Sequence, residues 1–122
     1  MIPIKSKIGN IFYSRSGTHA LVEALKSCGF KKGSEILIPD FTCIWLPLSC
    51  YFAHLKPILV DINSDDYNIS IGSMQEVLSD KTVGIITVDS FGSNVDLKST
   101  NIFCKENNLV HIRDQANGSF DN

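Results

Sequence analysis

The stretch "TVGIITVDS" (82–90) decides the fold, because it is a near-continuous apolar run between polar neighbours. A strand that is buried on both faces has this composition, whereas a half-exposed strand alternates apolar and polar side chains. Helical spacing of apolar residues follows at 94–108, and a further strand candidate, "LVHIRD", follows at 109–114. This order of strand, helix and strand predicts parallel strands that are joined by a covering helix.

The same alternation extends back to the N-terminus. We predict strands at 10–14, 35–39 and 56–62, helices at 18–27, 43–55 and 71–79, and a polar loop at 63–70. The strand at 10–14 and the helix after it, which closes at Gly29, form a first strand-helix unit in this interpretation. We therefore expect one α/β domain over residues 1–122, with three layers and a mostly parallel sheet between helices.

The helix at 43–55 is apolar nearly all round, and this composition is typical of a buried helix. The aromatic residues around it are predicted to pack in the core rather than to form a stacking platform. They are Phe41, Trp45, Tyr51 and Phe52.

Length and charge limit the function classes. The 122 residues are 43% hydrophobic, which is enough for one core, and 11 basic residues nearly balance 13 acidic ones. No basic run exceeds Lys31–Lys32, so we expect no nucleic-acid partner. The sequence shows neither a signal peptide nor a membrane span, and a cytoplasmic location is expected. The cysteines lack metal-ligand spacing, so we predict reduced and mostly buried thiols at Cys28, Cys43, Cys50 and Cys104.

The junction between the first predicted strand and the helix after it contains Ser16, Gly17 and Thr18. The free N–H groups of a first helical turn and the helix dipole favour an anion there, and Gly17 lets a ligand approach the backbone. A serine or threonine in this place is also the ordinary N-cap of a helix. The motif by itself leaves both interpretations open.

Asp114 lies at the carboxyl end of a predicted parallel strand, the edge at which open α/β sheets place their ligands. A carboxylate there can keep a ring nitrogen protonated, or it can simply cap a turn. Asp61 and Asp89 also end strands, so position alone does not single out Asp114. The histidines have no spacing typical of a metal site or a catalytic triad, so we interpret His19, His54 and His111 as structural or surface residues.

Taken in order, five stretches resemble the DegT/DnrJ/EryC1/StrS family of pyridoxal-phosphate (PLP) aminotransferases, which have fold type I and act mostly on nucleotide-linked keto-sugars. The stretches are "SGTHALVEALKSCGFKKGSEILIPDFTC" (16–43), "PILVDINSDDYNIS" (57–70), "KTVGIITVDSFG" (81–92), "VDLKSTNIFCKENNLVHIRD" (95–114) and "DQANGSF" (114–120). The resemblance covers about residues 11–120 and implies the N-terminal part of the family's large domain.

The resemblance also implies roles for individual residues. Residues 16–18 fall on the phosphate-binding turn of PLP, and Asp114 falls on the acid that pairs with the pyridine nitrogen. Asn117 occupies the place of a Gln or His that faces the phenolic oxygen, and Cys43 the place of an aromatic residue that stacks on the ring. Asp89 stands where a histidine is frequent.

The main departure from the family is the Schiff-base lysine, which lies well beyond the Asp114 strand in family members. None of the nine lysines matches that position: Lys5, Lys7, Lys26, Lys31, Lys32, Lys56, Lys81, Lys98 and Lys105. We therefore expect this chain by itself to be catalytically silent. The resemblance implies that it is part of an enzyme that transfers an amino group from an amino acid, with glutamate as the expected donor, to a nucleotide-linked keto-sugar. It also implies that a second subunit of a homodimer completes the site. A truncated remnant that binds PLP reversibly, or a receiver-like signalling module, are the alternatives.

Overall fold

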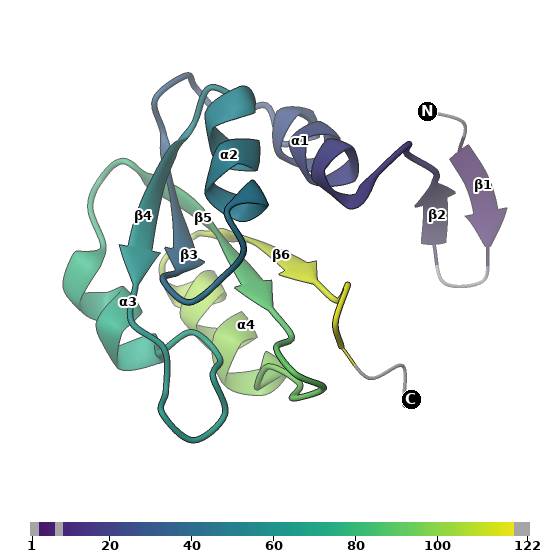
Figure 1. Cartoon of the computed structure of the whole chain (residues 1–122). Coiled ribbons are helices and arrows are strands. Elements are labelled where there is room, and N and C mark those ends of the chain that lie inside the picture. Colours follow the sequence, from purple (N-terminus) through teal and green to yellow (C-terminus); the bar gives the residue numbers. More distant parts are fainter. Residues whose placement is uncertain (1–2, 7–8, 119–122) are drawn as a thin grey trace.

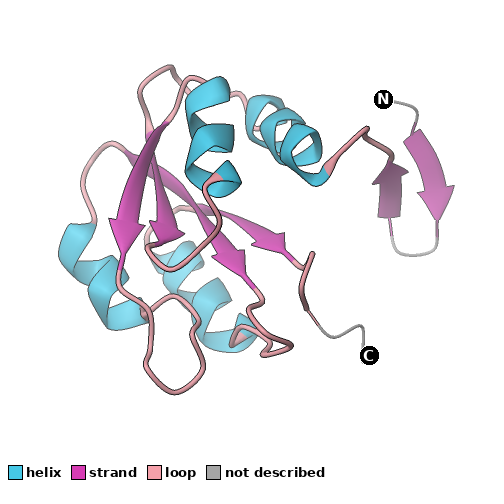
Figure 2. Cartoon of the chain, in the orientation of Figure 1, coloured by secondary structure: helices cyan, strands magenta, loops and turns pink. Residues whose placement is uncertain are grey.

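The computed structural model describes residues 3–6 and 9–118 (Figure 1). A short hairpin of β1 (Pro3–Ser6) and β2 (Gly9–Phe12) comes first. The remaining elements alternate, as Figure 2 shows by colour. They are α1 (Gly17–Ser27), β3 (Glu35–Pro39), α2 (Trp45–Phe52), β4 (Lys56–Val60), α3 (Ile71–Val77), β5 (Thr82–Val88), α4 (Leu97–Glu106) and β6 (Val110–Asp114).

The main sheet has four parallel strands in the order β4-β3-β5-β6. Helices α1 and α2 lie on one face and α3 and α4 on the other, so the molecule has the three layers that the apolar strands predicted (Figure 1). The α/β class is confirmed. Because all four strands run the same way, their carboxyl ends meet at one edge of the sheet.

Side-chain alternation along β3 divides the core into two parts. Ile36 and Ile38 pack with Leu25 of α1 and Leu46 of α2, while Leu37 faces the other way into the cluster with α3 and α4. Every residue of β3 is buried because the strand has a neighbour on each side and helices on both faces. The central strand is therefore a rigid base for the loop that follows it.

The N-terminal strand differs from the expectation. Residues 10–14 were predicted to open the parallel sheet, but β2 ends at Phe12 and pairs antiparallel with β1 in a separate hairpin. Strands β4 and β5 pair with the two edges of β3, so β2 cannot pair with this central strand. The prediction that residues 10–14 and the following helix form the first strand-helix unit is thus wrong.

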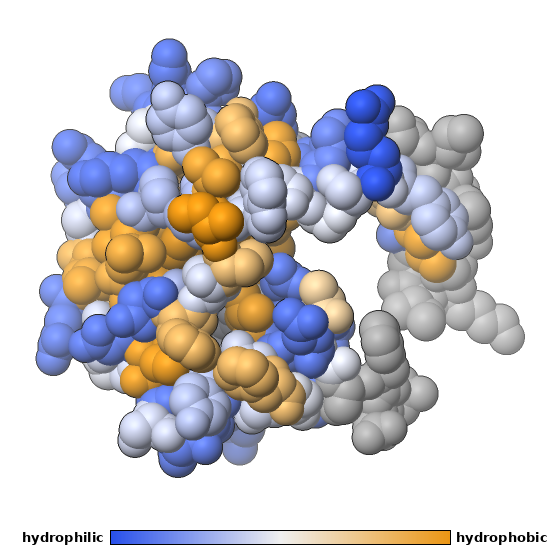
Figure 3. All heavy atoms as spheres, in the orientation of Figure 1, coloured by the Kyte–Doolittle hydropathy of each residue, from blue (hydrophilic) through white to orange (hydrophobic). Residues whose placement is uncertain are grey.

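The prediction of a buried second helix is also wrong. Leu46, Ser49 and Cys50 of α2 are buried, but the flanks of the helix carry exposed apolar side chains that Figure 3 shows in orange around α2. The four aromatic residues expected in the core are exposed by 49–70%: Phe41, Trp45, Tyr51 and Phe52. One side of α2 packs on the sheet and another on α1, and the remaining side has no neighbour among the residues that the structure describes.

The thiols follow the prediction in part. Cys50 and Cys104 are buried, Cys28 is half-buried and Cys43 is exposed. Within residues 3–6 and 9–118, no group of three or more potential ligands could hold a metal ion. No helix in that part of the chain has the length and apolar character needed to cross a membrane.

Candidate active site

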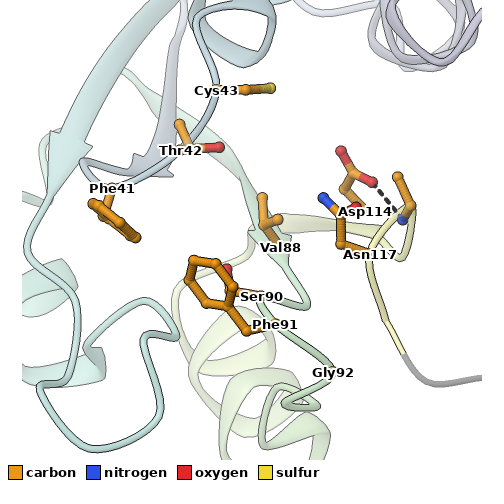
Figure 4. A pocket seen from close by; sticks show the side chains of 10 residues that line it. Phe41, Thr42, Cys43, Val88, Ser90, Phe91, Gly92, Asp114 and Asn117 are labelled. Carbon is orange, nitrogen blue, oxygen red and sulfur yellow. Dashed lines mark hydrogen bonds between the residues drawn. The ribbon is translucent and has the colours of Figure 1, made fainter.

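A cavity of about 600 Å³ opens at the carboxyl ends of β3, β5 and β6 (Figure 4). Open α/β sheets bind their ligands at this edge. The lining residues come from the three loops that follow these strands and from the strand ends: Phe41, Thr42, Cys43, Val88, Ser90, Phe91, Gly92, Asp114, Ala116 and Asn117. The cavity is large enough for a substituted aromatic ring.

Asp114 and Asn117 stand on the β6 side of this cavity (Figure 4). Asp114 is the last residue of β6, and its Oδ1 accepts a hydrogen bond from the Ala116 backbone N–H at 2.9 Å. This bond turns the chain and holds the carboxyl group in place, while a carboxylate has further acceptor sites for a ligand. The turn brings Asn117 into the same lining.

Cys43 and Thr42 lie on the β3 side of the cavity, across from Asp114 (Figure 4). They belong to the segment between the buried strand β3 and α2, which begins at Trp45. Three of the residues assigned to the site by resemblance, Cys43, Asp114 and Asn117, therefore meet in one cavity although 71 positions separate the first two. Their roles toward a ligand stay predictions.

Ser16, Gly17 and Thr18 form the amino end of α1 and are not among the residues that line the cavity. Ser16 is the N-cap, and its hydroxyl oxygen accepts from the His19 N–H at 3.1 Å. A Cβ built on Gly17 would meet no atom within 4 Å, so the backbone is open to a ligand here. The structure thus shows the cap, and the phosphate-binding role of the turn stays a prediction.

Behind the cavity lies an ion pair that sequence reasoning missed. Val88 and Ser90 face the cavity, and Asp89 between them points to the other face of the sheet, where it is fully buried. Arg113 donates to it in a bidentate manner, from Nη2 at 2.6 Å and from Nε at 3.1 Å. The sequence analysis noted Asp89 as a strand end and as the residue in place of a frequent histidine, but it did not predict a partner. The available signal was a second charged residue, Arg113, directly before Asp114.

Phe41, Tyr67 and Phe91 form a cluster at the rim of the cavity, with ring centroids 5.6–6.1 Å apart. All three rings are exposed by 46% or more. Tyr67 and Phe91 have φ angles of 59° and 52°, which are uncommon for residues with large side chains. Such backbone conformations cluster at functional sites.

The histidines do not form a catalytic triad. The Ser14 hydroxyl and the Glu23 carboxylate both approach Nδ1 of His19, at 2.6 and 3.5 Å, whereas in a triad the two partners bond to different ring nitrogens. His111 bonds through Nε2 to the Thr87 hydroxyl and through Nδ1 to Oδ1 of Asn101. Burial, supported by the nearby Arg113 charge and opposed by Asp89, lowers the pKa of His111 below 6.5. The structural interpretation of both residues agrees with these contacts.

No lysine lines the cavity among the residues that the structure describes. Lys56, for example, pairs with Glu35 at 3.3 Å at the start of the strands, the opposite end of the sheet from the cavity. That this chain offers no lysine at the reaction centre stays a prediction.

Comparison with known proteins gives the family. Residues 11–120 match the DegT/DnrJ/EryC1/StrS aminotransferase family. The chain belongs to this family. Its curated relatives include GDP-perosamine synthase of Escherichia coli O157:H7, which is 29% identical over 101 residues, or 83% of this chain and 28% of the relative.

Solved structures of DegT-type enzymes have the same fold. The aminotransferase from Psychrobacter cryohalolentis is 30% identical with a TM-score of 0.81, over 85% of this chain and 26% of that chain. A GDP-4-keto-6-deoxy-D-mannose-3-dehydratase from E. coli, which has hydrated PLP bound, is 26% identical with a TM-score of 0.73, over 81% and 27%. The DegT relatives are thus sugar aminotransferases or dehydratases, and the prediction of fold type I is confirmed. This chain spans little more than a quarter of the length of these relatives.

Proposed function

We propose that this chain provides the cofactor-facing part of a PLP-dependent aminotransferase that transfers an amino group, with glutamate as donor, to a nucleotide-linked keto-sugar. The observation that carries the proposal is the meeting of Asp114, Asn117 and Cys43 in one cavity at the carboxyl edge of the sheet. Membership of the DegT family and the PLP held by a solved relative support it.

The residues present fit such a cofactor. Asp114 would hold a proton at the pyridine nitrogen, because a carboxylate in contact with that nitrogen favours its charged form. The Asn117 amide would face the phenolic oxygen, and the Cys43 side chain would flank the ring from the β3 side. The N–H groups at the start of α1, with the hydroxyls of Ser16 and Thr18, would bind the phosphate.

When bound, PLP supplies an electron sink for the negative charge that develops on the amino-bearing carbon of the substrate. Asp114 would support this chemistry by holding a proton at the ring nitrogen. The covalent anchor and the base that moves the substrate proton require an amine, and none lines the cavity within residues 3–6 and 9–118. We propose that residues outside these 122, in the same chain or in a second subunit, supply it.

Binding of pyridoxine 5′-phosphate tests the proposal. This analogue keeps the ring nitrogen, phenol and phosphate but has no aldehyde, so it cannot react adventitiously with surface lysines. We expect saturable binding to the chain, weakened about 10- to 100-fold by Asp114→Asn, which retains the bond to Ala116 but loses the charge. Asp61→Asn, at the end of β4, is the matched control and should leave affinity unchanged. Equal affinities of wild type and Asp114→Asn would contradict the proposal.

A non-catalytic remnant is the second candidate, favoured by the lack of a lysine at the cavity in the described part of the chain. The intact mass of the protein from its native source separates the two. A mass well above 13.5 kDa supports the enzyme, and one of 13.5 kDa supports the remnant.

A further inference from the structure

Asp89 is a fully buried carboxylate directly behind the proposed cofactor cavity, and no step of the proposed function uses it. It follows β5, and its side chain faces away from the cavity that its two neighbours line. Burial of a charge is costly unless the charge is paired and hydrogen-bonded. The residues that donate hydrogen bonds to Asp89 therefore indicate which part of the structure it stabilises.

Those partners lie at the end of β6 and in two loops, the one after β6 and the one before α4. From β6 and the residues after it, Arg113 donates two hydrogen bonds and Gln115 donates one from Nε2 at 3.3 Å. From the loop before α4, the Val95 backbone N–H donates to Oδ1 at 3.1 Å. A bidentate guanidinium-carboxylate pair restricts both distance and orientation, so these loops are held in one relative geometry.

The contacts of Asp89 enclose Asp114 along the chain. Arg113 precedes Asp114 and Gln115 follows it, and the Asp89 N–H also donates to the Asp114 carbonyl at 3.0 Å. Farther along, Gly118 lies so close to Asp89 that a Cβ there would be 2.9 Å from Oδ2. The residues on both sides of Asp114 are thus in contact with Asp89.

We propose that Asp89 is a positioning residue: through its hydrogen bonds with Arg113, Gln115 and the Asp114 carbonyl it holds the turn of residues 114–117 so that the Asp114 carboxylate meets the ring nitrogen of the cofactor. This inference rests on the proposed function, because it gives that site its supporting structure. Partners that orient a ligand-binding group from behind commonly change affinity or activity by about 10- to 100-fold when removed.

Amide hydrogen exchange tests the holding of the turn without any ligand. Two amides report on it: Ala116 N–H, which lies in the turn and donates to Asp114, and Gly92 N–H, which donates from the loop after β5 to the Asn117 carbonyl at 3.2 Å. In Asp89→Asn we expect their exchange to accelerate about tenfold or more relative to amides of β3, because local opening becomes easier there. Unchanged exchange at both reporters would overturn the proposal.

Glu35→Gln is the matched control. Glu35 is also a buried carboxylate, with Lys56 at 3.3 Å and the Ser79 hydroxyl at 2.6 Å, but it lies at the start of β3, away from the cavity. We expect it to lower the free energy of unfolding without accelerating exchange at the reporters relative to β3. Equal acceleration in both variants would mean that the pair is only a stabilising contact.

Ligand binding then tests the orientation. Asp89→Asn should bind pyridoxine 5′-phosphate about tenfold more weakly than wild type, and Glu35→Gln should bind equally well. At saturation, the ¹⁵N shift of the labelled ring nitrogen should move toward the unprotonated value in Asp89→Asn alone, which a mere loss of stability would not cause. Arg113→Lys keeps the charge but loses the bidentate geometry, and it serves as the second variant if Asp89→Asn does not fold.

The outcomes separate the two proposals. If the wild-type chain does not bind the analogue, the proposed function fails, and the role of Asp89 toward a ring fails with it. If wild type binds and Asp89→Asn matches it in affinity and ring-nitrogen shift, the positioning role alone is overturned. Weaker binding with an altered shift, against an unaffected Glu35→Gln, supports the positioning role.

Discussion

The four cysteine thiols stand in different environments, although the sequence predicted the same one for most of them. Burial raises the pKa of Cys50 and of Cys104 to about 11, and it also raises the pKa of Cys28. Cys43 is exposed and lines the cavity. Because the thiolate is the reactive form and must be reached by the reagent, reactivity should follow these environments.

Alkylation of the native chain with iodoacetamide should therefore modify Cys43 first. Cys50 and Cys104 should react only after unfolding, since they are inaccessible and remain protonated at neutral pH. Peptide mass spectrometry against time gives the order. With saturating pyridoxine 5′-phosphate, modification at Cys43 should slow, because the ligand occupies the cavity that this residue lines.

Half-buried Cys28 is the internal control for that experiment, because it lies at the end of α1 and outside the cavity lining. Its rate should not respond to the ligand. If Cys43 and Cys28 slowed together, the effect would be a general stabilisation, and occupation of the cavity would be disproved.

Among the secondary-structure elements, the pairing of β5 with β6 depends on one small residue. Gly84 in β5 is the register partner of Val110 in β6. A Cβ at position 84 would lie 2.9 Å from the Val110 carbonyl oxygen and 3.4 Å from the Ile36 side chain. Backbone in a paired strand cannot move away without losing ladder hydrogen bonds, so a side chain here would strain the edge that carries Asp114.

Gly84→Ala should therefore lower the free energy of unfolding by about 1–3 kcal/mol, the usual cost of overpacking. Gly72→Ala, in α3, is its counterpart: the added Cβ would meet only the Ser70 hydroxyl oxygen, at 3.8 Å. Alanine in a helix is favoured over glycine by about 0.5–1 kcal/mol, so this variant should gain stability. Urea denaturation measures both, and equal effects would show that the β5–β6 contact is not tight.

For the whole molecule, the stability should fall as pH decreases from neutral. The folded chain holds His111 with a pKa below 6.5, so below that pH the unfolded chain binds a proton that the folded chain does not. Hydrogen bonds from the Ser79 hydroxyl and Lys56 lower the pKa of Glu35 below 4.5, which removes further stability once pH falls past that value. Both effects act in the same direction, in two successive pH ranges.

His111→Gln should reduce the pH dependence of the free energy of unfolding in the upper range, between about pH 7 and the pH at which carboxylates titrate. The pH dependence in the lower range should remain as in wild type. Equilibrium unfolding at a series of pH values provides the curve. An unchanged slope in His111→Gln would show that this ring does not control the acid response.

The sequence by itself determined the α/β class, the parallel strands and most element boundaries, because periodicity and turn residues act locally along the chain. The resemblance to the family assigned Cys43, Asp114 and Asn117 to the site; the fold brings them into one cavity, and their roles stay predictions. Only the tertiary structure decided that the first strand leaves the sheet, that α2 is exposed on one side, and that Asp89 pairs with Arg113. These features depend on which elements become neighbours: β3 pairs with β4 and β5 and not with β2, and the ion pair joins β6 to the residue that follows the adjacent strand β5.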